Sequence, residues 1–191
     1  MKVSPRLFLA AFVAAAIGAA APVQGQAPAQ PPAAPSANPI SDGSRMMFQI
    51  VSGFVTKSAE KAPEELYAFK PTPEVRTFGQ LVGHTADSAY FICASAMGEK
   101  PPVEGIEKTK TTKADLVKAL TDSVAYCQKA YGGLTDATAG EQLPFFHGKL
   151  ARVTILDFST AHLYEHYGNM VTYMRLKGIV PASSEKQPAG N

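Results

Sequence analysis

Four stretches of the chain repeat apolar side chains every three or four residues, the spacing that gathers them on one face of an α-helix. No stretch alternates apolar and polar residues convincingly enough to predict a strand. The sequence therefore predicts an all-α fold, and four amphipathic helices of this length favour a four-helix bundle. The predicted helices cover residues 44–62, 77–97, 112–131 and 152–177.

Residues at the helix ends support these boundaries. Thr77 and Gln80 have the spacing of a capping box, in which the two side chains satisfy free backbone N–H groups at a helix start. Thr112 is a candidate cap of the same kind, and Gly98 and Gly178 are typical of helix ends. The segments between the helices, including the polar stretch 99–111, are predicted to be loops.

The N-terminal 40 residues differ from the rest. Lys2 and Arg6 precede an unbroken apolar run over residues 7–21, which is the pattern of a secretory signal peptide. The run is shorter than the ~20 residues that span a bilayer, so we expect no stable membrane insertion after cleavage. We expect cleavage between Gly25 and Gln26, and therefore a periplasmic or extracellular protein.

This pattern divides the chain into four parts. Residues 1–25 form the signal peptide, and residues 26–40, rich in Pro, Ala and Gln, are predicted to be a disordered linker. Residues 41–181 form the bundle, and residues 182–191 a polar C-terminal tail. The formal charge of +2 includes Lys2 and Arg6, so the exported part is neutral and nucleic acid is not an expected partner.

Histidines carry the main chemical signal. The chain has only four, and His162 and His166 are spaced so that both imidazoles lie on one face of a helix, where they can share a metal ion. His84 is the natural third ligand. Asp87 could be a fourth ligand, an acceptor that orients an imidazole, or an exposed acid. His147 is expected to be structural or to face solvent. The alternative for the pair itself is that His162 and His166 are surface histidines, or core histidines with satisfied hydrogen bonds.

No catalytic residue is assigned from the sequence, because no Ser or Cys nucleophile stands in a recognisable motif. Glu165 and Tyr164 are candidates for acid–base catalysis. Glu165 projects about 80° away from the histidine direction and is expected to be exposed. Tyr90 and Tyr173 could line a pocket, although aromatic residues at helical spacing more often belong to the core.

Two segments together resemble the DinB-like (DinB/YfiT) superfamily of metalloenzymes. They are Phe69-Lys-Pro-Thr-Pro-Glu-Val-Arg-Thr-Phe-Gly-Gln-Leu-Val-Gly-His84 and His162-Leu-Tyr-Glu-His166-Tyr-Gly-Asn-Met. The resemblance covers residues 44–181 and implies that His84, His162 and His166 bind one divalent ion. Many relatives continue the last His with Arg-Gly-Gln. Tyr167, Gly168 and Asn169 stand here instead, so the arginine that could hold an anionic substrate group is missing.

The resemblance also implies an up-down-down-up arrangement in which helices 77–97 and 112–131 run parallel. Cys93 and Cys127 both lie late in these helices, so parallel packing could bring their sulfur atoms together. An oxidising compartment allows a disulfide. Two buried free thiols are the alternative at this point.

Three imidazoles would leave one position on the ion open for water or substrate, as in catalytic zinc sites. We expect zinc or nickel, although imidazole suits other divalent ions too. The resemblance implies a metal-dependent enzyme, hydrolase-like or thiol-dependent transferase-like, acting on an unidentified small molecule. Export away from cytosolic thiols favours hydrolysis. The alternatives are a non-catalytic metal- or ligand-binding bundle, or incidental histidines; a homodimer is compatible with either.

Overall fold

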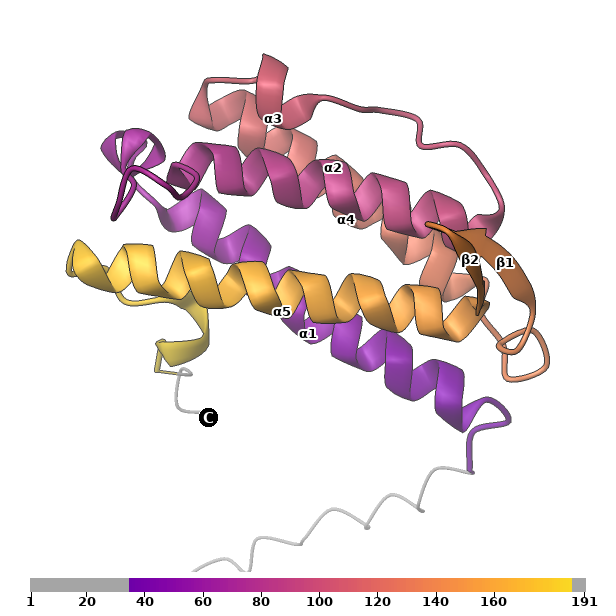
Figure 1. Ribbon diagram of the computed structural model, residues 1–191. Helices are drawn as coiled ribbons and strands as arrows, with labels where there is room; N and C mark the ends of the chain where they lie inside the picture. The colour runs from indigo at the N-terminus through magenta and orange to yellow at the C-terminus, as the bar shows by residue number, and fades with distance from the viewer. Residues whose placement is uncertain (1–34, 187–191) are drawn as a thin grey trace, which may run out of the picture. The chain divides into compact units, whose positions relative to one another are not determined.

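The computed structural model describes residues 35–186, and four long helices dominate this part of the chain (Figure 1). They are α1 (Pro39–Lys61), α2 (Phe78–Met97), α4 (Lys113–Gly132) and α5 (Arg152–Leu176). The shorter elements are η1 (Glu64–Ala68), α3 (Ile106–Thr109), β1 (Gln142–Phe145), β2 (Gly148–Ala151) and η2 (Ala182–Ser184). The predicted signal peptide and most of the predicted linker lie outside the described residues.

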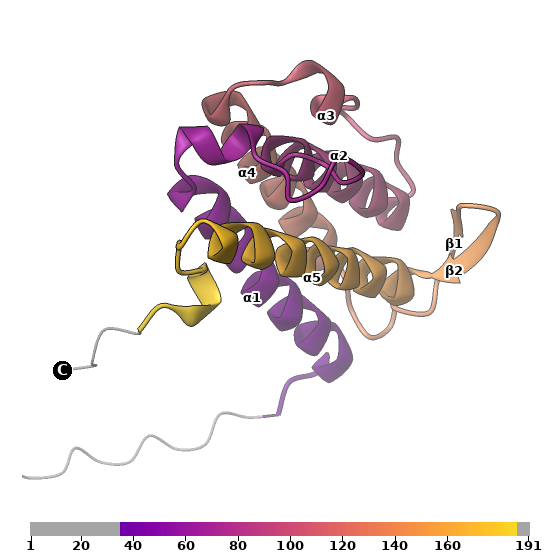
Figure 2. The same ribbon diagram turned by 60° about the vertical axis from the view of Figure 1, so that its left-hand side comes forward.

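Helices α2 and α4 run parallel, with α1 and α5 running in the opposite direction (Figures 1 and 2). Near the start of both α2 and α4, a Cβ atom on Gly83 would lie 3.2 Å from the Leu116 side chain. Near their ends, Cys93 on α2 is bonded to Cys127 on α4. The up-down-down-up four-helix bundle is therefore confirmed.

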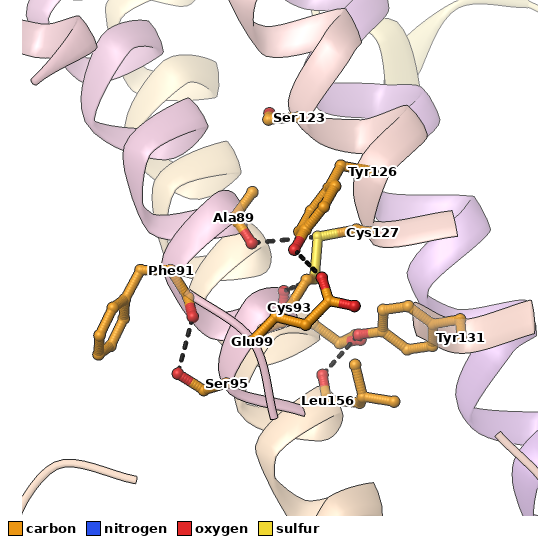
Figure 3. The surroundings of a disulfide bond; sticks show 12 residues. Ala89, Phe91, Cys93, Ser95, Glu99, Ser123, Tyr126, Cys127, Tyr131 and Leu156 are labelled. Atoms are coloured by element: carbon orange, nitrogen blue, oxygen red, sulfur yellow. Dashed lines mark hydrogen bonds between the residues drawn. A yellow bond between two sulfur atoms is a disulfide. The ribbon is translucent and has the colours of Figure 1, made fainter. Parts of the chain in front are cut away.

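A disulfide joins the two parallel helices (Figure 3). Cys93 and Cys127 are both fully buried, and their Cα atoms lie 5.3 Å apart. The bond closes a loop over a sequence separation of 34, which in the chain-entropy model stabilises the fold by about 4 kcal/mol. The structure thus contains the disulfide and not the alternative pair of free thiols.

One hydrophobic core lies between the four long helices. Phe48 of α1 stacks on Tyr131 of α4, with ring centroids 4.2 Å apart. The Tyr131 hydroxyl, buried with them, donates to the backbone carbonyl of Leu156 in α5. The other large side chains with almost no exposure also come mainly from these helices, among them Phe78, Leu120, Ile155, Leu163, Met170 and Met174.

Helix α1 begins at Pro39, five residues before the predicted start, so Pro39 and Ile40 are helical rather than part of the linker. Proline suits a first helical position because its missing N–H needs no partner there. The Asp136 carboxylate accepts hydrogen bonds from the backbone N–H groups of Ile40 and Ser41. This cap comes from the α4–β1 connection, almost a hundred residues away in sequence.

The segment before α5 was predicted to be a loop, and that prediction was wrong in part. Strands β1 and β2 form an antiparallel hairpin in which Phe145 pairs with Gly148. Each strand has four residues, too few for a clear alternating pattern. The predicted loop 99–111 likewise contains the one-turn helix α3.

The beginning of the predicted polar tail contacts the bundle. The Tyr167 hydroxyl donates to the Ser183 hydroxyl and accepts from the Ser183 backbone N–H. These bonds place η2 against α5. Between residues 35 and 186, none of the helices has the length and apolar character needed to cross a membrane.

Candidate metal centre

Helix α5 supplies two of the three predicted metal ligands. His162 and His166 lie one turn apart, and their Nε2 atoms are separated by 3.0 Å. Two ligand nitrogens of a tetrahedral ion are about 3.4 Å apart when each bond is ~2.0–2.1 Å. His166 is buried and His162 partly buried. The facing nitrogens therefore have nearly the separation that a shared ion requires.

Helix α2 supplies the third ligand. The His84 ring centroid lies 4.8 Å from that of His166 and 5.3 Å from that of His162. One ring nitrogen from each of the three histidines lies within 4.8 Å of the others. Within residues 35–186 this is the one group of at least three His, Cys, Asp or Glu side chains that could hold a metal ion. The predicted triad is thus brought together by two helices that are adjacent in the bundle.

All three imidazoles are held in the form that binds metals. Burial lowers the pKa of His166 to about 3, and the neighbouring imidazoles of His162 and His84 add to this effect. Burial also lowers the pKa of His162 and of His84. A neutral imidazole offers a free lone pair, so the triad needs to lose no protons before binding a cation at neutral pH.

Asp87 is not a fourth member of the triad. Its two carboxylate oxygens accept hydrogen bonds from the backbone N–H groups of Ile106 and Glu107, at 2.8 and 2.9 Å. These bonds hold the first turn of α3 against α2. Asp87 is therefore not a fourth ligand, does not orient an imidazole directly, and is not an exposed acid. It anchors backbone, and through that backbone it positions Glu107.

Glu107 is the acidic residue that contacts the triad. Its Oε2 atom lies 3.4 Å from Nδ1 of His84, and its Oε1 atom accepts a hydrogen bond of 2.9 Å from Nε of Arg76. A carboxylate at Nδ1 favours the tautomer whose Nε2 atom is free for a metal. Glu107 was not predicted as a site residue, because it lies in a predicted loop and no local sequence pattern links it to His84.

Asn169 has the corresponding place beside His166. The amide nitrogen Nδ2 of its side chain lies 3.5 Å from Nδ1 of His166. An amide flipped by 180° would instead bring Oδ1 to this position, where it could accept a hydrogen bond from the Nδ1–H group and leave the Nε2 lone pair of His166 free. Asn169 thus differs from the glutamine of many relatives but is still in contact with the triad.

A polar cleft of about 590 Å³ opens beside His166. Arg76, Glu107, Glu165 and Asn169 are among its lining residues. Glu165 is exposed, as predicted, and lies at the wall of this cleft. The buried Tyr173 also lines it, and its hydroxyl donates to the backbone carbonyl of Arg76 at 2.8 Å. Tyr173 therefore fixes the loop that carries Arg76.

The other residues considered from the sequence lie elsewhere. His147 is exposed in the turn of the hairpin and is not part of the triad. Tyr90 is buried and packs against Tyr126 of α4, with ring centroids 5.4 Å apart. Tyr164 lines a different groove, between α1 and α5.

Solved structures share this fold. A DinB-like protein from Bacillus cereus ATCC 10987 is 15% identical, with a TM-score of 0.65, over 77% of this chain and 97% of its own. A DinB-like protein from Bacillus subtilis is 20% identical, with a TM-score of 0.61, over 76% of this chain and 99% of its own. A mycothiol-dependent maleylpyruvate isomerase is 14% identical, with a TM-score of 0.57, over 68% of this chain and 60% of its own.

Sequence comparison gives the family directly. No curated protein matches the chain. The sequence model of the DinB superfamily, however, matches residues 55–170, which include all three histidines of the triad. With this match over more than half of its length, and with the fold described above, the chain belongs to the DinB superfamily.

Proposed function

We propose that this protein is a divalent-metal-dependent enzyme with an open coordination position, acting on a small molecule outside the cytoplasm. The observation that carries the proposal is the ligand set. Three neutral imidazoles converge, and within residues 35–186 no Asp, Glu or Cys joins them. Structural metal sites normally have four protein ligands, whereas catalytic sites keep one position free. Zinc and nickel are the ions that we expect.

Some residues of the site would hold the metal ion, and others orient the imidazoles that bind it. His84, His162 and His166 would hold the ion through one ring nitrogen each, while Glu107, at Nδ1 of His84, favours the tautomer whose Nε2 atom is free. When bound, the ion would supply a Lewis acid and lower the pKa of a bound water toward neutrality. The triad is partly to fully buried, which strengthens electrostatic interactions there.

The polar cleft offers groups that could orient a substrate. Arg76 contributes a positive charge at the cleft wall, with its Nε held by Glu107. It could take the place of the arginine that is missing after His166. Glu165, on the same wall and one residue from His166, is the candidate for proton transfer, because it is an exposed carboxylate beside the triad.

Between the two reaction classes, we favour hydrolysis. The structural similarity to a mycothiol-dependent isomerase makes a thiol-dependent reaction worth testing, but at 14% identity it supports the fold alone. The disulfide between Cys93 and Cys127 is what an oxidising compartment permits. This fits the apolar N-terminal segment and export, and an exported enzyme would not normally meet low-molecular-weight cytosolic thiols.

The experiment that tests the proposal is cobalt substitution followed by addition of azide. Co(II) bound to the triad with an open position will change its visible absorption spectrum when azide binds. Protein loaded with zinc or nickel in place of cobalt is then screened against ester, amide and lactone substrates. A His162→Ala/His166→Ala variant is screened beside it. A cobalt spectrum that saturating azide leaves unchanged, together with no metal-dependent turnover, would favour the non-catalytic metal-binding alternative.

A further inference from the structure

Phenylalanine rings gather on the surface next to the triad. Phe91 of α2, Phe145 and Phe146 of the hairpin and Phe158 of α5 form an aromatic cluster. The Phe145 and Phe146 centroids lie 4.4 Å apart, and Phe146 lies 5.7 Å from Phe91 and 6.0 Å from Phe158. Figure 3 shows the Phe91 ring on the side of α2 away from the disulfide. Phe145 belongs to the hydrophobic core, whereas Phe91, Phe146 and Phe158 lie outside it.

Three of the four rings are open to solvent. Phe145 is buried beneath the others, but Phe146 is 65% exposed, Phe158 41% and Phe91 39%. A single exposed apolar side chain needs no explanation, whereas a contiguous group of them commonly marks a binding surface.

The backbone at Phe146 is strained in a way that serves this cluster. Phe146 has φ = 51°, and it is the only residue other than glycine with positive φ in the described part of the chain. A bulky residue rarely adopts this conformation, and glycine or asparagine would fit the turn without strain. Folding alone therefore gives no reason for a phenylalanine there. Its ring, however, completes the exposed cluster.

The cluster is continuous with the candidate metal centre. The Phe158 ring stacks near His162, with centroids 6.3 Å apart and ring planes at 26°. Along one face of α5 the order is Phe158, His162, His166 and Asn169. Asn169 and His166 line the polar cleft. The triad is thus flanked by a polar cleft on one side and by aromatic rings on the other.

We propose that the aromatic cluster binds a flat, aromatic part of the small molecule whose polar part reaches the triad. This inference rests on the proposed function and specifies its substrate class: aryl-bearing compounds. Ring–ring contacts of this kind are favourable beyond the area that they bury. A second copy of the chain is a poorer occupant. Three partly exposed rings offer a few hundred Å², well below the ~800 Å² that each partner of a stable complex contributes.

The test compares two metal-binding hydroxamates, one with a methyl group and one with a naphthyl group on the carbonyl carbon. Acetohydroxamate and 2-naphthohydroxamate are titrated into zinc-loaded full-length protein by calorimetry. We expect the naphthyl compound to bind about tenfold more tightly, consistent with one good aromatic contact. Phe146→Gly and Phe158→Ala should each remove most of this advantage, measured as the ratio of the two affinities within the same variant. Phe146→Gly also relieves the backbone strain, so it is expected to fold.

The matched control is Leu176→Ala, since Leu176 is 59% exposed near the opposite end of α5. It should leave both affinities unchanged. Equal affinity of the two probes, or a naphthyl advantage that survives both Phe substitutions, would overturn the inference while the metal centre stands. So would a dimer in sedimentation experiments that Phe146→Gly dissociates.

Failure of the metal centre itself gives a different result. If neither zinc nor nickel binds, the proposed function fails, and 2-naphthol is titrated into the metal-free protein. The chain contains no tryptophan, so naphthol fluorescence can be followed without overlap from an indole. Binding that Phe146→Gly weakens at least fivefold would support an aromatic site without a metal. Absence of such binding would overturn the aromatic site as well.

Discussion

The carboxylate of Glu107 lies 3.4 Å from Nδ1 of His84, although the two residues belong to different helices, α3 and α2. The contact depends on Asp87, whose carboxylate binds the backbone at the start of α3. One acidic residue thus anchors a turn of backbone, and that turn presents a second acidic residue to the candidate metal ligand.

Glu107→Gln should weaken zinc binding by about 10- to 100-fold, because loss of a carboxylate partner commonly lowers metal affinity by that factor. One zinc per chain should still bind at high concentration, since the three imidazoles remain. Competition with a chromophoric chelator measures the affinity. Glu165→Gln is the matched control, because Glu165 lines the same cleft without contacting an imidazole nitrogen. Equal zinc affinity for both variants and the wild type would show that Glu107 does not support the centre.

A pair of glycine substitutions tests how closely α3 approaches α2. A Cβ atom on Gly83 would lie 2.8 Å from Cα of Glu107, so Gly83→Ala should displace α3 and destabilise the protein by about 1–3 kcal/mol. Gly53 of α1 has nothing within 4 Å of such an atom, so Gly53→Ala should stabilise by roughly 0.5–1 kcal/mol. Urea denaturation measures both. Stabilisation by Gly83→Ala would contradict the close approach.

Removal of the disulfide should destabilise the protein strongly. Cys93→Ala/Cys127→Ala is expected to lower the free energy of unfolding by about 4 kcal/mol, since the unfolded chain regains the entropy of an open loop. Denaturation with and without a reducing agent measures this change. The reductant should destabilise the wild type and leave the variant unaffected. Titration of two free thiols per chain in the non-reduced, unfolded protein would show that the bond does not form.

The metal-free protein should lose stability in acid already at pH values above the range in which carboxylates usually titrate. The pKa of His166 is about 3 in the folded state and ordinarily about 6.5, so between these values the unfolded chain binds a proton that the folded chain does not. The free energy of unfolding should therefore fall as pH decreases from about 6.5 toward 3, by up to about 1.4 kcal/mol per pH unit for each such histidine. His84 and His162 act in the same direction.

Denaturation of the metal-free protein at a series of pH values measures this slope. His166→Gln should flatten it. A slope that His166→Gln does not reduce would mean that this imidazole is not held neutral by burial.

The helices were predictable because each carries its own local signals. Thr77 and Gln80 form the capping box expected from their spacing, and Gly98 ends α2 in the left-handed conformation. The early start of α1 was not predictable, since its cap, Asp136, comes from a distant connection. The hairpin escaped prediction for another reason: its turn places Phe146 at positive φ, where sequence rules expect glycine or asparagine.

The triad was predictable only in part from local sequence. Spacing alone placed His162 and His166 together. His84 was the natural third ligand, and the family resemblance then implied the same residue. The contacts around the triad depend on tertiary structure. Glu107 reaches His84 only because Asp87 holds α3 in place. Phe158 joins an aromatic cluster only because the hairpin packs Phe145 against it.

The most direct measurement of the central claim is the metal content of the protein over residues 26–191, purified without a histidine tag and analysed by mass spectrometry. We expect about one equivalent of a single divalent metal per chain, because the triad forms one three-histidine site. His162→Ala/His166→Ala should lose it, and His147→Ala should retain it. Absence of metal from the wild type after incubation with zinc and with nickel, or equal metal content in the double variant, would contradict the account.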